Sequence, residues 1–122
     1  MNSQAKMIAV IDDDVAVCDS TRCLLEAYGF DVRTYLSCAD FFGESPDAAC
    51  VIVDYQMPNL NGLDFASELR RSGRYVPAIM FTATDDPTVE RQAAGLQISQ
   101  VLKKPLSAGA LLRAIHNELE IG

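Results

Sequence analysis

Short apolar runs that alternate with helix-like segments are the feature that most limits how this chain can fold. The run Met7–Ile11 is continuously apolar, as expected for a strand buried on both faces of a sheet. Further strands are predicted over 31–35, 49–53, 78–81 and 98–102, each followed by a segment with helical apolar spacing. Five strands that alternate with five helices predict an α/β fold, in which a parallel sheet carries helices on both faces.

Capping residues mark where the predicted helices begin and end. Side chains that commonly N-cap helices precede four of these segments: Asp14, Ser37, Asp86 and Ser107. Ser37 with Asp40 is similar to a capping box, with Asp in place of the usual Glu. Gly29 lies where a left-handed C-cap residue is expected, so the first helix should end beside it. The inward face of that helix is expected to carry Val17, Thr21, Leu24, Leu25 and Tyr28.

Length and charge limit the class of protein. The chain has 122 residues, which suits one domain over 1–122 with no second domain. Its net charge of −7 argues against direct binding to nucleic acid or to an anionic membrane, since both need basic faces. No apolar run approaches the ~20 residues of a membrane span and no signal peptide is visible, so a cytoplasmic location is expected. The four cysteines lack a C-x-x-C pair, which favours free thiols over a zinc site.

The carboxyl ends of the predicted strands carry the acidic residues of most interest. In a doubly wound sheet, functional groups gather at these ends. Asp12 and Asp13 follow the first strand and Asp54 ends the third, so the three converge if those strands are neighbours. Close carboxylates repel one another unless a cation neutralises them, and a hard divalent ion such as Mg²⁺ binds oxygen ligands of this kind.

The ends of the fourth and fifth strands add hydrogen-bond donors and a positive charge. Thr82 offers a hydroxyl, the backbone N–H of Ala83 a further donor, and Lys104 a compact ammonium group. A carboxylate nucleophile, Mg²⁺, a lysine and a hydroxyl together make a site that can receive a phosphoryl group. Each part alone has an ordinary explanation, because aspartates are common at helix N-termini and Lys-Pro is common in loops. The combination at four strand ends favours phosphoryl chemistry.

Four stretches of the sequence carry a resemblance to a known family. They are Val10–Asp14, Val53–Gly62 with its D-x-x-M-P-x-x-x-G pattern, Phe81–Ala83 and Lys103–Leu106. The chain resembles the receiver domain of two-component response regulators over essentially its whole length. The resemblance implies a CheY-like, flavodoxin-like sheet of order 2-1-3-4-5. It also implies a signalling module rather than an enzyme. The only reactions of such a module are its own Mg²⁺-dependent phosphorylation and dephosphorylation.

The resemblance assigns the phosphoryl acceptor and the metal ligands. Asp54 is similar to the phosphorylated aspartate of the family. Mg²⁺ would be bound directly by Asp13, by Asp54 and by the main-chain carbonyl of Gln56. Asp12 is similar to the acidic residue that holds the ion through water.

The resemblance also assigns the residues that respond to the phosphoryl group. Thr82 matches the switch hydroxyl and Lys104 the lysine that pairs with the phosphoryl oxygens, and the bond before Pro105 is expected to be cis. The position on the fifth strand where the family usually has Tyr or Phe holds Val101 here. Because valine cannot make the large rotamer change of an aromatic ring, we expect the signal to travel through Thr82 and the loop 83–87.

Protein partners follow from the same resemblance. The phosphoryl donor would be a sensor histidine kinase or a histidine phosphotransfer protein, and the output would pass to a downstream protein that the sequence does not identify. A phosphorylation-dependent homodimer through the fourth helix, fifth strand and fifth helix is a further expectation, weakened by Val101. No output domain follows the last helix, so a stand-alone regulator is expected.

Other functions stay open at this point. Asp12 and Asp14 have the D-x-D spacing of haloacid-dehalogenase-type phosphohydrolases, although such an enzyme would need a longer chain for a substrate cap and would leave Asp54 unexplained. A degenerate interaction domain that works without phosphate would not need the intact acceptor set. A flavodoxin-type cofactor carrier shares the sheet topology, but no phosphate-binding loop follows Ile11.

Overall fold

The computed structural model describes residues 6–58, 60–105 and 107–121, so Asn59 and Leu106 of the motif stretches lie outside the described residues. The strands form one parallel sheet in the order β2-β1-β3-β4-β5, which confirms the predicted topology. The strands are β1 (Met7–Ile11), β2 (Asp31–Tyr35), β3 (Cys50–Asp54), β4 (Ala78–Thr82) and β5 (Ile98–Lys103). The helices are α1 (Val15–Ala27), α2 (Cys38–Glu44), α3 (Gly62–Arg71), α4 (Pro87–Gly95) and α5 (Ala108–Ile121).

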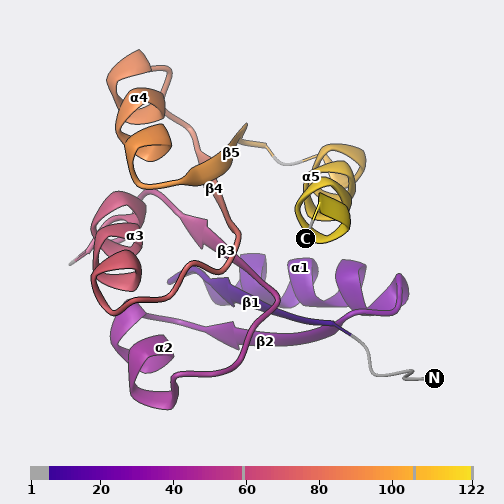
Figure 1. Cartoon of the computed structure of the whole chain (residues 1–122). Helices are drawn as coiled ribbons and strands as arrows, with labels where there is room; N and C mark the ends of the chain where they lie inside the picture. Colours follow the sequence, from indigo (N-terminus) through magenta and orange to yellow (C-terminus); the bar gives the residue numbers. More distant parts are fainter. Residues whose placement is uncertain (1–5, 59, 106, 122) are drawn as a thin grey trace.

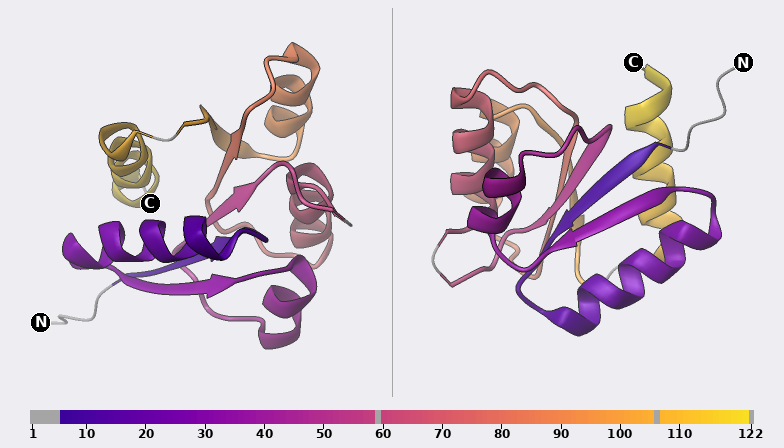
Figure 2. Two further views of the ribbon diagram at one scale, coloured as in Figure 1. Left: turned by 180° about the vertical axis from the view of Figure 1, so that it is seen from behind. Right: turned by 90° about the horizontal axis from the view of Figure 1, so that it is seen from below.

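Helices cover both faces of the sheet, as predicted. Figures 1 and 2 show α1 and α5 on one face, and α2, α3 and α4 on the other. Successive strand residues point to opposite faces, so Ile8 and Val10 pack with α1 and α5 while Ala9 and Ile11 pack in the opposite layer. All residues of β3 and β4 are buried, as their continuous apolar runs predict.

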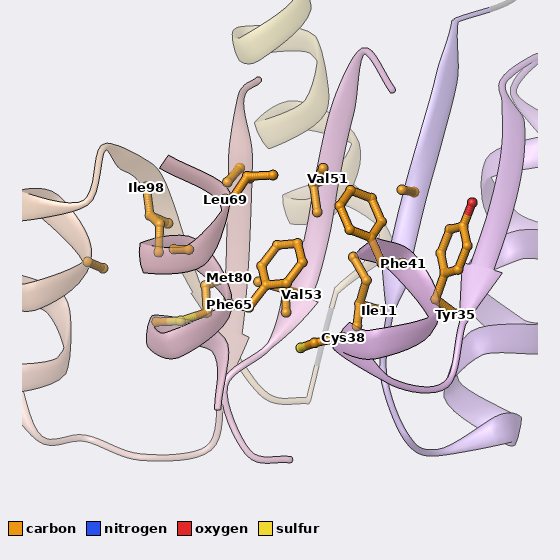
Figure 3. Close-up of a cluster of buried hydrophobic side chains, with 14 of the residues drawn as sticks. Ile11, Tyr35, Cys38, Phe41, Val51, Val53, Phe65, Leu69, Met80 and Ile98 are labelled. Carbon is orange, nitrogen blue, oxygen red and sulfur yellow. The ribbon is translucent and has the colours of Figure 1, made fainter. Parts of the chain in front are cut away.

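The layer beneath α2, α3 and α4 has an aromatic centre, drawn in Figure 3. Phe41 of α2 and Phe65 of α3 are fully buried and meet edge to face, with ring centroids 5.2 Å apart. Tyr35 of β2 contacts Phe41 in the same way at 5.5 Å. Such pairs contribute about 0.5–1.5 kcal/mol beyond the burial of their area. These contacts therefore attach the short helix α2 to the sheet.

The ends of α1 lie where the sequence predicts them, but one expected inward residue does not point inward. Asp14 is the N-cap and its Oδ1 accepts hydrogen bonds from two backbone N–H groups of the first turn. Gly29 follows the helix with a φ of +92°, a conformation that favours glycine. The expectation for Tyr28 was wrong, because this residue is the C-cap and its side chain is 62% exposed. Cys18 lies buried on the same face of α1.

A complete capping box begins α3. Asn61 Oδ1 accepts from the N–H of Asp64 at 2.9 Å, and Asp64 Oδ2 accepts from the N–H of Asn61 at 3.3 Å. At α2, Ser37 Oγ accepts from the N–H of Asp40 at 3.0 Å, which is the first half of the predicted box. The start of α3, which follows the loop after β3, is thus fixed by two reciprocal hydrogen bonds.

Parallel pairing brings the carboxyl ends of four strands to one edge of the sheet. Ile11 of β1 pairs with Val53, and Asp54 of β3 pairs with Phe81 of β4. Residues that follow β1, β3, β4 and β5 therefore meet at this edge. Within the ranges that the structure describes, no helix combines the length and the apolar character needed to cross a membrane.

Candidate functional site

Three carboxylates meet at the carboxyl edge of the sheet. Asp12 follows β1 and Asp54 is the last residue of β3, and their exposed fractions are only 1% and 3%. Asp13 lies beside them on the surface, and one carboxylate oxygen from each residue lies within 4.8 Å of the others. The structure therefore brings together the three acidic residues that the strand ends predict.

Asp12 is the least satisfied of the three. Its Oδ1 accepts a hydrogen bond from the N–H of Asp14 at 2.9 Å, whereas its Oδ2 is buried with no partner among the described residues. Burial raises the pKa of Asp12 to about 6, and the nearby charge of Asp54 acts in the same direction, against the Asp14 hydrogen bond. A buried carboxylate oxygen without a partner, beside two further carboxylates, fits a hard divalent cation such as Mg²⁺.

Lys104 places a positive charge beside the central carboxylate. Its Nζ lies 3.1 Å from each carboxylate oxygen of Asp54 and 5.4 Å from the centre of the Phe81 ring. The N–H of Lys104 donates to the carbonyl of Thr82 at 2.9 Å, which extends the β4–β5 pairing up to the site. The bond between Lys104 and Pro105 is cis, as expected. The main-chain bond thus places the backbone of Lys104 at the site, and the ion pair with Asp54 holds its ammonium group there.

Thr82 is the last residue of β4 and Ala83 follows it, next to these charges. The Thr82 side chain is buried, and its Oγ1 accepts a hydrogen bond from the N–H of Thr84 at 3.0 Å. The N–H of Ala83 donates to Oε1 of Gln56 at 3.3 Å. The N–H of Ala83 is therefore already engaged as a donor, whereas the Thr82 hydroxyl is engaged as an acceptor.

Gln56 bridges two loops of the site. Its N–H donates to Oδ1 of Asp54 at 3.2 Å, and its side chain reaches across to Ala83. The loop after β3 and the loop after β4 are thus connected through Gln56, which also contacts the Asp54 carboxylate. The role of the Gln56 main-chain carbonyl as a metal ligand stays a prediction.

Gly62 is a part of the site that reasoning from the sequence left without a role. A Cβ at this position would lie 2.9 Å from Sδ of Met80, 3.0 Å from the carbonyl oxygen of Asp54 and 3.0 Å from Cα of Tyr55. Its N–H donates to the carbonyl of Tyr55 at 3.0 Å. The loop after Asp54 can fold back this closely only because position 62 has no side chain. The final G of the D-x-x-M-P-x-x-x-G pattern is the signal that marks it.

Val101 and Lys103 of β5 make contacts outside the acidic cluster. Val101 pairs with Met80 of β4 and is half-buried against the layer of α2, α3 and α4, away from the acidic cluster. Lys103, which had no predicted role, donates from Nζ to the carbonyl of Thr84 and, at 2.8 Å, to Oδ1 of Asp85. The end of β5 therefore holds the loop after β4 through a side chain.

Asp14 does not join the acidic cluster. The carboxylates that approach one another are those of Asp12, Asp13 and Asp54, among the residues that the structure describes. Oδ1 of Asp14 instead caps α1 by accepting from two backbone N–H groups. This geometry argues against the D-x-D arrangement of a phosphohydrolase, in which Asp12 and Asp14 would act together.

The family model and the curated relatives that match this chain point to the same family. A family model described as the response regulator receiver domain matches residues 8–116. Among curated relatives, the transcriptional regulatory protein FixJ of Azorhizobium caulinodans is 33% identical over 114 residues, which cover 92% of this chain and 54% of FixJ. The transcriptional regulatory protein TdiR of Thauera aromatica is 33% identical over 119 residues, covering 96% of this chain and 52% of TdiR. The chain thus spans about half the length of these relatives.

Solved structures agree with the family model. A response regulator receiver protein from Burkholderia phymatum superposes with a TM-score of 0.82 at 33% identity, over 96% of this chain and 97% of that one. A response regulator receiver domain protein from Clostridium thermocellum gives a TM-score of 0.86 at 28% identity, over 95% of both chains. The chemotaxis protein CheY4 of Vibrio cholerae, at 19% identity and a TM-score of 0.87 over 95% of this chain and 100% of that one, shares the fold.

Proposed function

Since the chain belongs to the response regulator receiver domain family, we propose that Asp54 accepts a phosphoryl group from a histidine kinase or a histidine phosphotransfer protein. The observation that carries this proposal is the position of the Asp54 carboxylate. It is buried between an acidic pair with an unpaired oxygen and a lysine 3.1 Å away. A carboxylate held between a cation site and an ammonium group is suited to receive phosphorus and to keep the charge of the product neutralised.

In the proposed reaction, a carboxylate oxygen of Asp54 attacks the phosphorus of the donor phosphohistidine. The bond from phosphorus to the imidazole nitrogen breaks, and that nitrogen keeps the electron pair. Lys104, now bound to both oxygens of Asp54, is close enough to neutralise the phosphoryl oxygens as charge moves onto them. The hydroxyl of Thr82 and the N–H of Ala83 would then exchange their present contacts for phosphoryl oxygens.

Asp12, Asp13 and Asp54, with the main-chain carbonyl of Gln56, would hold Mg²⁺ in this proposal. The unpaired buried Oδ2 of Asp12 supports the assignment. The ion would supply positive charge that offsets the three carboxylates and the incoming phosphoryl group. Beyond its own phosphorylation and dephosphorylation, we propose no substrate for the chain.

We expect a downstream protein partner, a cytoplasmic location and, for the phosphorylated form, a homodimer. FixJ and TdiR are named transcriptional regulatory proteins and are about twice as long as the matched region. They give no support to a stand-alone regulator. The expected lack of nucleic-acid binding therefore concerns this chain alone, whose net charge is −7.

Phosphorylation by a small donor tests the acceptor. With acetyl phosphate and Mg²⁺, intact-mass spectrometry should find one added phosphoryl group on the wild type and none on Asp54→Asn. Asp40→Asn is the matched control, because this exposed carboxylate on α2 lies outside the acidic cluster, and it should be phosphorylated like the wild type. An Asp54→Asn protein that still gained the phosphoryl group would refute the assignment of the acceptor.

Thermal unfolding tests the metal site separately. A ligand that binds only the folded state raises the melting temperature, so millimolar Mg²⁺ should stabilise the wild type. Asp13→Asn should reduce that increase, while Asp40→Asn, on the exposed face of α2, should leave it unchanged. A wild-type melting curve that does not respond to Mg²⁺ would show that the acidic cluster is not a magnesium site.

A further inference from the structure

The two ends of α4 are attached to the rest of the molecule in different ways. Figure 1 shows this helix beside α3 and β5, at one end of the sheet order. Its C-terminal end is bound by one half-buried arginine from α3. Its N-terminal end follows the loop after β4, which is held by one exposed lysine from β5.

Arg70 is the attachment at the C-terminal end. Its Nε donates to the carbonyl of Leu96, the C-cap of α4, at 3.0 Å, and its Nη2 to the carbonyl of Gln97 at 3.0 Å. Its Nη1 donates to the carbonyls of Arg74 and Val76 in the loop before β4, at 3.1 and 2.8 Å. One guanidinium thus joins two loops through four charge-assisted hydrogen bonds, each among the stronger kind.

Lys103 is the attachment at the N-terminal end. Its Nζ donates to the carbonyl of Thr84 and to Oδ1 of Asp85, a side chain that is 97% exposed. Solvent weakens contacts of this kind, so they contribute far less than the four bonds of Arg70. Asp86, the N-cap of α4, follows directly in the same loop.

The loop that Lys103 holds is also bound to the acceptor site. The N–H of Thr84 donates to the hydroxyl oxygen of Thr82, and the N–H of Ala83 donates to Gln56. Both contacts use groups that the phosphoryl oxygens would recruit. If the Thr82 hydroxyl turned to the phosphoryl group, the N–H of Thr84 would lose this acceptor, and the carbonyl of Thr84 that accepts from Lys103 would be free to shift.

We propose that Lys103 holds the N-terminal end of α4 only in the unphosphorylated state, and that phosphorylation turns α4 about a fixed end at Arg70. The inference rests on the proposed function of Asp54. It supplies a route for the signal in a chain whose β5 carries Val101 in place of an aromatic residue. The moving part is the segment from Thr84 to the first turn of α4, and the fixed part is Leu96–Ile98.

Beryllofluoride with Mg²⁺, which stands in for the phosphoryl group, provides the first test. Contacts made only in the resting state oppose binding, so Lys103→Ala and Asp85→Asn should each bind beryllofluoride about two- to five-fold more tightly than the wild type in calorimetry. The two variants change the net charge in opposite directions. If both variants bind beryllofluoride more tightly, this shared increase in affinity cannot come from the change in net charge alone. Arg91→Ala, an exposed change on α4, is the control and should bind as the wild type does.

Opposite shifts in the two variants, or no shift in either, would overturn the role of Lys103. Failure of the wild type to bind beryllofluoride would instead contradict the proposed function itself. Asp54→Asn marks this difference, since it should abolish binding in every background.

Amide hydrogen exchange tests the fixed end. On addition of beryllofluoride and Mg²⁺ to the wild type, exchange should change over residues 84–90 and stay constant over 96–98. Arg70→Lys cannot reach four carbonyls, so in this variant the change should spread to 96–98. Equal changes over both segments in the wild type would overturn the pivot, as would an Arg70→Lys protein whose exchange matches the wild type.

Discussion

At the scale of single residues, the proposed acceptor site contains carboxylates whose burial is unfavourable for stability. Asp12 has a buried oxygen without a partner among the described residues, and burial raises its pKa to about 6. Asp54 is buried as well and is matched by Lys104. Burying these carboxylates costs stability, a cost that fits the cation and the phosphoryl group proposed for this site.

The pH dependence of stability should reveal the cost at Asp12. Its folded pKa of about 6 lies above the ordinary 3.8, so the folded state keeps this proton longer than the unfolded state does. In the absence of metal, the free energy of unfolding should fall as pH rises from about 4 to 6, by up to about 3 kcal/mol relative to Asp12→Asn. Urea unfolding of both proteins across this range measures the difference, and saturating Mg²⁺ should remove it. Parallel pH profiles for the two proteins would contradict the raised pKa.

Gly62 allows a prediction about backbone packing. In Gly62→Ala the new methyl group would meet the carbonyl oxygen of Asp54 and Cα of Tyr55 at 3.0 Å. Neither backbone atom can move without shifting the loop after Asp54. Stability should fall by about 1–3 kcal/mol, and phosphorylation by acetyl phosphate should slow. Gly43→Ala is the matched control, because a Cβ there has no neighbour within 4 Å and α2 should gain up to about 1 kcal/mol. Equal unfolding midpoints for the two variants would argue against the close approach.

At the scale of elements, the sequence predicts where helices begin better than which side chains they bury. Asp14 caps α1 as expected because its chemistry is local. Tyr28 fits the apolar stripe of the same helix, yet it follows the last helical residue and is exposed, since the stripe continues in sequence where the helix does not. The full capping box at Asn61 was missed because Asn and Asp can also simply form a turn.

The two helix starts with an acidic third residue give a matched pair of variants. Asp64 returns a hydrogen bond to the N–H of Asn61, whereas the described contacts of Asp40 include no return bond to Ser37. Both carboxylates interact equally with the helix dipole, so that effect cancels between them. Asp64→Ala should therefore destabilise the protein by about 0.5–1 kcal/mol more than Asp40→Ala in urea unfolding. A larger loss for Asp40→Ala would contradict this view of α3.

At the scale of the whole molecule, the sheet order decides which strand ends meet. That convergence was predictable from the sequence, because parallel strands place their carboxyl ends at one edge and Asp12, Asp54 and Thr82 all follow buried runs. The contacts of Arg70 and Lys103 could not be predicted from the sequence. They depend on the path of loops whose carbonyls carry no mark in the sequence.

The layer of α2, α3 and α4 should contribute strongly to global stability. Phe41 is fully buried against Tyr35 and Phe65, so Phe41→Ala should lower the free energy of unfolding by about 3–5 kcal/mol. The urea dependence should keep its slope if the unfolded state is unchanged. Tyr75→Ala, at a site 68% exposed, is the control and should stay within about 0.5 kcal/mol of the wild type. Comparable losses in both variants would contradict the central place of Phe41.

Arg70 binds the loops that precede β4 and β5, whereas the acidic cluster lies at the carboxyl ends of β1 and β3. Glu90 and Arg91 of α4 are exposed and belong to neither of these sites. If Asp54 accepts the phosphoryl group as proposed, substitutions at these exposed positions can change the partner without changing the acidic cluster. Duplicated copies of such a chain can therefore come to bind different partners while they keep the same residues in the acidic cluster. This favours large sets of signalling proteins that do not interfere with one another.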